Sequence, residues 1–109
     1  MSASTQFSQL DMWKPAHELV NDVAPSDAAS YGGVKPMWTA KRNDNANAEN
    51  TGRGVSVDDV KQNGVLNPVY VWHNKGRETI SDGHHRAIAA YDANPNTLVP
   101  VEHDWNGAR

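Results

Sequence analysis

The chain has 109 residues, of which 38% are hydrophobic and 21% charged, and its formal net charge at pH 7 is -3. This length predicts one small domain over residues 1–109, and the negative charge argues against a broad basic surface that coats a nucleic-acid duplex. The absence of cysteine excludes a disulfide framework, a thiolate zinc site and a cysteine nucleophile. No window approaches the roughly 18 apolar residues of a membrane span, so we expect no membrane partner and a cytoplasmic location.

The first half of the chain predicts short helices separated by turns. Pro15 suits the first position of a helix, and the apolar spacing after it predicts a helix or turn over Lys14–Val23. A second short helical stretch is expected over residues 37–42. The asparagine-rich tract that follows has nothing to bury, so residues 43–54 are expected to form a mobile surface loop. Three basic residues near Trp38 face either a phosphate backbone or solvent, and we favour a solvated face: Lys35, Lys41 and Arg42.

Sharper local signals begin at Val55. Ser56 followed by Asp59 resembles a capping box, with Asp in place of the usual Glu, at the start of a helix. Gly64 suits the left-handed residue that ends a helix, so a helix is expected over Val57–Asn63.

Two strands joined by a tight turn are expected after this helix. The first, Val69–His73, is apolar on both faces and is therefore expected to be buried on both. The turn signal Asn74-Lys75-Gly76 predicts that Arg77–Ser81 pairs back with it as a hairpin. Gly83 then breaks the strand, and a helix is expected over His85–Ala93.

The last strand expected is Leu98–Val101. Because Pro100 has no amide donor for a ladder, we expect this strand at an edge of the sheet. The order of elements predicts an α/β (α+β) fold, with one small domain that has a short mixed sheet and flanking helices. The most informative joint in this order lies between the second strand and the helix that follows it.

The segment Asp82-Gly83-His84-His85-Arg86 lies at this joint and combines the residue types that a phosphate site needs. Gly83 lets a ligand approach the main chain closely, and the free N–H groups of the following helix favour negative charge there. Arg86 offers a planar, charged fork for phosphate oxygens. Asp82 either caps the helix or holds a magnesium ion. His84 and His85 add donors or a general acid/base, and we favour His84 for proton transfer because it is nearer the open loop.

Two other interpretations of this segment remain open. In the first, Asp82 is a plain helix cap and the histidines are satisfied surface residues. In the second, the histidines bind a metal ion. Because adjacent helix positions diverge by about 100°, His84 and His85 are poor ligands of one ion. A more distant histidine is then required, from the set His17, His73 and His103.

Three stretches of the chain, in this order, resemble the ParB/sulfiredoxin superfamily. They are Gly64-Val65-Leu66-Asn67-Pro68-Val69-Tyr70-Val71, then Ile80-Ser81-Asp82-Gly83-His84-His85-Arg86-Ala87, and finally Val99-Pro100-Val101. The likeness is greatest to short ParB-like nuclease domain proteins of bacteriophages, in which Ala89-Ala90-Tyr91-Asp92 followed by Asn94-Pro95 also recurs. The recognisable core covers residues 55–104.

The resemblance implies a loop that cradles phosphate, with Asp82 beside the contacting residues Gly83, His84, His85 and Arg86. It implies ATP or CTP as ligand, magnesium as cofactor, and DNA as a second candidate partner. Kinase-like members also carry an acid near their first element. Glu18, next to His17, is its counterpart here, although the inserted Ala16 favours a plain solvated carboxylate.

Departures from the family pattern narrow the expected activity. No cysteine precedes the His-Arg pair, which excludes sulfiredoxin chemistry, and no helix-turn-helix domain is visible, so centromere-type partition is not expected. We therefore expect a nucleotide-dependent enzyme that hydrolyses an NTP or a phosphodiester bond. The alternative is a non-catalytic phage protein that has kept this fold and binds a host protein or nucleic acid.

Overall fold

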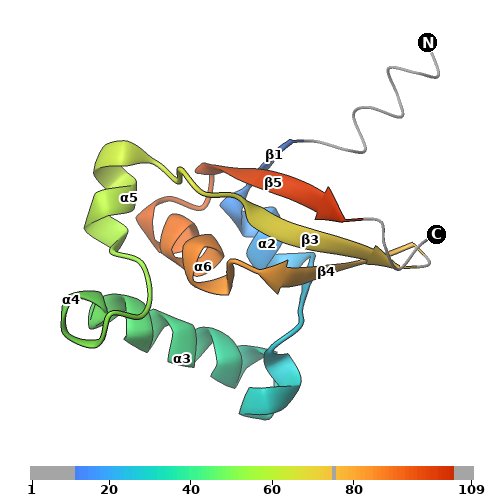
Figure 1. Ribbon diagram of the computed structural model, residues 1–109, viewed down its shortest axis with the longest axis horizontal. Coiled ribbons are helices and arrows are strands. Elements are labelled where there is room, and N and C mark those ends of the chain that lie inside the picture. Colours follow the sequence, from blue (N-terminus) through green and yellow to red (C-terminus); the bar gives the residue numbers. More distant parts are fainter. Residues whose placement is uncertain (1–11, 75, 105–109) are drawn as a thin grey trace.

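The computed structural model describes residues 12–74 and 76–104. Within these ranges the chain forms an α/β domain, as expected, and Figure 1 shows how its elements are arranged. In chain order the elements are β1 (Trp13–Pro15), α2 (Ala16–Asn21), β2 (Ala24–Pro25), the 3-10 helix η1 (Ala28–Tyr31), α3 (Val34–Ala46), α4 (Ala48–Thr51), α5 (Val57–Asn63), β3 (Val69–Asn74), β4 (Arg77–Asp82), α6 (His84–Ala93) and β5 (Leu98–Asp104). None of the helices in this part of the chain is long and apolar enough to cross a membrane.

The strands form one mixed sheet in the order β1-β5-β3-β4-β2. The β3–β4 hairpin is antiparallel, as predicted, whereas β5 lies parallel to β3 on its other side. The expectation that the last strand is an edge strand is wrong, because β1 pairs with it antiparallel and covers it. Pro100 lies opposite Trp13 in that pair, and the neighbouring Val101 N–H donates to the Met12 carbonyl at 2.8 Å. Since β1 is only three residues long, its sequence carries no recognisable strand pattern.

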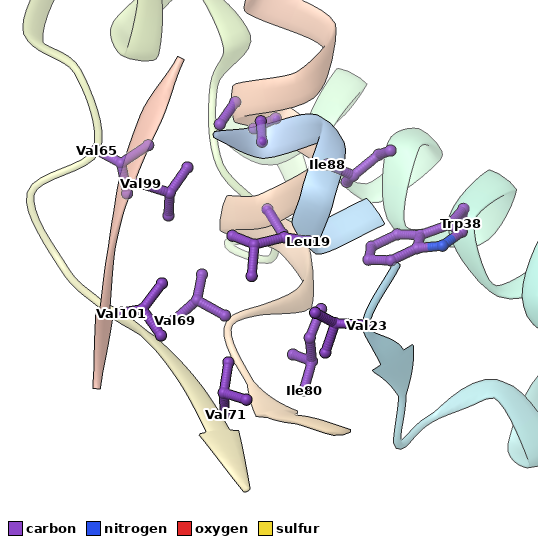
Figure 2. Packing of buried hydrophobic residues seen from close by; sticks show 14 of the residues in the cluster. Leu19, Val23, Trp38, Val65, Val69, Val71, Ile80, Ile88, Val99 and Val101 are labelled. Atoms are coloured by element: carbon purple, nitrogen blue, oxygen red, sulfur yellow. The ribbon is translucent and has the colours of Figure 1, made fainter. Parts of the chain in front are cut away.

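The helices lie on one side of the sheet, and the core lies between them and the strands (Figures 1 and 2). Figure 2 shows Leu19 of α2 between the strand valines and the side chains of Ile88 and Trp38. The expectation that β3 is buried on both faces is wrong. Val69 and Val71 are fully buried, but Tyr70 and Trp72 are each 36% exposed on the opposite face. The aromatic residues of β3 therefore lie on a face of the sheet that is open to solvent.

The largest difference from the sequence-based expectation concerns residues 43–54. The expected loop is wrong for most of this range, because α3 continues to Ala46 and α4 follows it. Asn45 explains why: it is buried, its Nδ2 donates to the His85 carbonyl at 3.1 Å, and its Oδ1 accepts from the Val55 N–H at 2.7 Å. Asn45 is polar but buried, because its hydrogen-bond partners come from segments that are remote in sequence. The composition of the tract therefore resembles that of a loop, although most of the tract is helical.

The other local signals are confirmed with small shifts. The helix Val57–Asn63 is present, and the Ser56 hydroxyl accepts from the Asp59 N–H at 3.2 Å as in a capping box. The first helix begins one residue after Pro15, which ends β1 and stands at the N-cap position in extended conformation. The helix after Gly83 begins at His84 rather than at His85.

Candidate functional site

The joint between β4 and α6 depends on Gly83. Its φ of 98° lies in the left-handed region, which side chains rarely adopt. A Cβ atom built on this residue would lie 3.0 Å from the Val69 Cα and 3.1 Å from Nη2 of Arg86. Glycine is therefore required both by the backbone turn and by the close approach of β3. This bend places the first turn of α6 next to the start of β3.

The first turn of α6 has no side-chain cap. The Oδ1 atom of Asp82 accepts from the Gly83 N–H at 2.8 Å, one position before the helix begins, so this carboxylate does not serve the helical amides. The Asp82 side chain is 73% exposed. The N-terminal end of α6 thus combines the unsatisfied amides and positive dipole end of a helix with an exposed carboxylate.

Arg86 tethers this end of α6 to β3. Its Nε and Nη2 atoms donate to the Pro68 carbonyl at 3.2 and 2.9 Å, and Nη2 lies 3.9 Å from Oδ2 of Asp82. Arg86 also lines a hollow of about 160 Å³ between α5 and the segment before β3. Since a guanidinium carries five N–H donors, the Pro68 carbonyl does not use all of them.

His85 points toward the end of α3. Its Nε2 lies 2.8 Å from Oδ2 of Asp44, and both side chains are slightly more than one quarter exposed. This is a histidine–carboxylate pair at hydrogen-bond distance, which fixes the orientation and tautomer of the imidazole. Asp44 belongs to the tract that composition assigns to a loop, so the sequence gives little sign of this partner.

His84 is buried, which corrects the expectation that it lies nearer the open loop. It is 5% exposed, and its ring packs near Trp38 with 6.1 Å between centroids. Burial lowers the pKa of His84, and the nearby charge of Asp27 only partly offsets this effect. The His84 Nε2 and Trp38 Nε1 atoms are buried without a hydrogen-bond partner among the described residues. The divergence of the two histidines, predicted from helix geometry, is confirmed.

A half-buried ion pair, in which Lys41 is buried and the Asp27 side chain is 44% exposed, lies beside His84. Lys41 Nζ donates to Oδ2 of Asp27 at 2.9 Å, and the same oxygen lies 3.8 Å from Nδ1 of His84. The hydrogen bond from Lys41 is the largest effect on Asp27 and holds the pKa of this carboxyl below its usual value. The expectation of a solvated face is therefore wrong for Lys41, which is 6% exposed. Lys41 lies four residues after Met37 and four residues before Asn45, and both of these are on the buried side of α3. This helical spacing is the sequence signal that places Lys41 on the buried side.

The remaining candidate residues lie apart from this joint. Glu18 pairs with Lys14, at 3.4 Å between Oε2 and Nζ, and the described contacts give it no ion pair with the Asp82–Arg86 segment. His73 and His103 do not join His84 and His85. They lie beside each other on β3 and β5, with 2.6 Å between Nε2 of His73 and Nδ1 of His103. Burial, followed by the neighbouring His103, lowers the pKa of His73.

Comparisons with known proteins add no relative. A scan of protein-family models, a search of curated proteins and a search of solved structures each gave no match to this chain. The resemblance to the ParB/sulfiredoxin superfamily therefore stays a prediction from the sequence.

Proposed function

We propose that this protein binds the phosphate groups of a nucleotide or nucleic acid at the N-terminal end of α6. One observation carries the proposal: the first turn of a ten-residue helix has no side-chain cap and follows a left-handed glycine. Uncapped helical amides together with the positive end of the helix dipole favour a bound anion. Arg86 and His85, in the first turn of the same helix, supply further donors. The resemblance to ParB-like domains supports the same ligand class, with ATP or CTP as candidates.

Asp82 fits the magnesium ion that such a ligand brings. Its side chain is 73% exposed; Oδ1 accepts from the Gly83 N–H, and Oδ2 has only the long contact of 3.9 Å to Nη2 of Arg86. Magnesium prefers oxygen ligands and retains waters, so one carboxylate together with phosphate oxygens suffices. When bound, the ion would neutralise phosphate charge and polarise the phosphorus–oxygen bonds.

If the protein also hydrolyses an NTP or phosphodiester bond, His85 is the better proton-transfer group. Its imidazole is partly exposed and is oriented by Asp44 at 2.8 Å. His84, in contrast, is 5% exposed, and its Nδ1 lies 3.8 Å from Oδ2 of Asp27. A general base must reach the proton that it abstracts, and burial denies His84 that access. The uncapped amides and Arg86 would stabilise the charge that develops on phosphate.

Binding is tested by thermal denaturation with ATP, CTP and GTP, each with magnesium. At about 100 times the dissociation constant, a ligand that binds only the folded state adds about 2.7 kcal/mol to its stability. We expect a rise in Tm that Arg86→Ala and His85→Gln each reduce, measured against each variant's own ligand-free Tm. The matched control is Lys35→Ala, which removes an exposed cation of α3. No rise with any nucleotide at millimolar concentration contradicts the proposal.

Turnover is tested separately at saturating substrate, with magnesium or manganese. If His85 transfers a proton, His85→Gln lowers the rate at saturating nucleotide by about 100- to 10,000-fold, a loss separate from its weaker nucleotide binding. His84→Gln then changes stability more than rate. A wild-type protein that binds nucleotide but shows no NTP, DNA or phosphotransfer activity rejects catalysis and leaves the binding function in place.

A second candidate function, binding of a protein partner such as a host protein without turnover, is favoured by the open face of the sheet. Trp13, Tyr70 and Trp72 are between 36% and 53% exposed there, and Leu98 of β5 is 58% exposed. Aromatic residues are enriched in protein interfaces. Under this function, Trp72→Thr abolishes capture of a partner from host lysate, whereas Arg86→Ala does not.

A further inference from the structure

Three side chains with metal-binding atoms meet at one end of the sheet, away from the Asp82–Arg86 segment. They are His73 on β3, Glu78 on β4 and His103 on β5. His73 and Glu78 are directly opposite each other in the antiparallel pair, and His103 is opposite Val71 in the parallel pair. Because side chains alternate between the faces of a strand, all three project from the face that carries the core.

This cluster continues the apolar core. On the same face, one step further into the domain, the three strands carry Val71, Ile80 and Val101, which are 0%, 0% and 3% exposed. The row of valine and isoleucine thus gives way to two imidazoles and a carboxylate. An apolar shell behind polar ligands restricts water and lowers the local dielectric constant, which strengthens metal–ligand interactions.

The ligand atoms are close enough to share one ion. One nitrogen from each histidine and one oxygen from Glu78 all lie within 4.8 Å of one another. The histidine rings are 4.8 Å apart between centroids, and their facing nitrogens, 2.6 Å apart, share a hydrogen bond. In a tetrahedral zinc site with bonds of about 2.0–2.1 Å, ligand atoms are separated by about 3.3 Å. Small side-chain rotations therefore convert the observed arrangement into a coordination site.

The exposure of the three side chains suits reversible entry of an ion. The His73 side chain is 7% exposed and that of Glu78 is 33% exposed, while His103 is intermediate. The site thus has one buried anchor and two ligands nearer solvent. Lys14 of β1 faces the same side of the sheet, and its positive charge would repel a metal ion. This repulsion is reduced because the Lys14 ammonium lies 3.4 Å from the Glu18 carboxylate.

We propose that His73, Glu78 and His103 bind one divalent transition-metal ion, with Zn²⁺ as the preferred ion. Two imidazoles and one carboxylate match the ligand types of zinc, whereas magnesium prefers oxygen ligands alone. The ion replaces the hydrogen bond between the histidines and joins the ends of three neighbouring strands. A fourth coordination position stays open to water. This site is independent of the proposed phosphate site.

The test uses the full-length chain without a histidine tag, freed of metal by a chelator and dialysis. Co²⁺ serves as the spectroscopic probe because its visible absorption intensifies when nitrogen and oxygen ligands hold it in low coordination. Zn²⁺ is then titrated by calorimetry and by displacement of Co²⁺. We expect one ion per chain, a higher Tm with Zn²⁺, and no displacement by Mg²⁺.

Variants separate this site from adventitious binding. His103→Ala and Glu78→Gln are the first choices, since their side chains are less buried than that of His73 and the variants are expected to fold. Each is expected to weaken Zn²⁺ binding at least about 10- to 100-fold, the loss typical of removing even a supporting residue of a metal site. The matched controls are His17→Ala on α2 and Glu102→Gln on the opposite face of β5, which keep wild-type affinity.

Two results would overturn the proposal. One is the absence of a Co²⁺ spectrum and of any Zn²⁺ binding heat in the folded wild-type chain. The other is wild-type affinity in the folded double variant His103→Ala/Glu78→Gln, with folding checked by circular dichroism. Nucleotide binding is measured on the same samples, because it is expected to be unchanged by these variants whether or not zinc binds.

Discussion

Arg86 donates two hydrogen bonds to the carbonyl oxygen of Pro68, from Nε at 3.2 Å and from Nη2 at 2.9 Å. The pair joins the first turn of α6 to the residue that precedes β3. Arg86 therefore has a structural task in addition to the phosphate contact proposed for it. The two roles are separable, because the first requires the planar fork and the second requires mainly positive charge.

We expect Arg86→Lys to lower the free energy of unfolding by about 1.5–3 kcal/mol, the usual contribution of hydrogen bonds that involve a charged group. The lysine keeps the charge but loses the fork, so phosphate affinity falls less than in Arg86→Ala. Urea denaturation measures the stability, and nucleotide titration measures the affinity. Equal stability of Arg86→Lys and the wild type would contradict the structural role.

Asn45→Ala tests the clamp at the end of α3. The substitution leaves the His85 carbonyl and the Val55 N–H without the bonds that Asn45 now makes at 3.1 and 2.7 Å. Because Asn45 is buried, we expect a loss of about 1–3 kcal/mol of stability. Amide exchange at Val55 should accelerate as well. The control Asn43→Ala, at an exposed position of the same helix, is expected to change stability by less than about 0.5 kcal/mol.

Gly83→Ala and Gly64→Ala form a matched pair. Both glycines have positive φ, 98° and 73°, so either alanine is strained. A Cβ at Gly64 meets nothing within 4 Å, whereas at Gly83 it lies 3.0 Å from the backbone of Val69. Gly64 combines its positive φ with a ψ of -169°, a conformation that residues other than glycine hardly adopt, so we expect Gly64→Ala to cost about 1–3 kcal/mol from backbone strain alone. We expect Gly83→Ala to cost more, because the clash with β3 adds to the strain. Urea denaturation measures the stability of both variants. A larger loss of stability in Gly64→Ala than in Gly83→Ala would show that β3 moves to accommodate the added Cβ.

Stability should decrease in mildly acidic solution because of His84. Burial holds the pKa of this imidazole below its ordinary value of 6.5. Above that pH both the folded and the unfolded chain carry neutral His84, so the group adds no pH dependence. Below it the unfolded chain takes up a proton that the folded chain refuses, and the free energy of unfolding falls until the pH reaches the folded pKa.

Urea denaturation at several pH values between about 7.5 and 5 measures this effect. His84→Gln should reduce the slope of stability against pH. A further part of this slope comes from His73, because burial lowers its pKa as well. Identical slopes for His84→Gln and the wild type would contradict the assignment to His84. The ion pair of Asp27 adds its own loss only at lower pH, because its pKa lies below 3.8.

The sequence alone determined those elements whose signals are local. The capping box at Ser56, the antiparallel pairing of β3 with β4 and the glycine break before α6 each depend on a few neighbouring residues, and each is found where expected. The alternation of buried and exposed residues in β3 is not visible in the sequence, because its exposed positions carry Tyr70 and Trp72. Apolar residues in a strand do not reveal whether a second layer covers them.

Only the tertiary structure decided which side chains come together. Lys41 and Asn45 are polar residues of α3 that are nevertheless buried, because distant segments supply their partners. The partner of Lys41 is 14 positions away, and the two partners of Asn45 are 10 and 40 positions away. His73 and His103 are 30 residues apart and meet because β5 inserts beside β3 in parallel. Composition and periodicity report how a residue relates to its neighbours in the chain. A site assembled across strands depends instead on sheet order and register, which are fixed by packing of the whole domain.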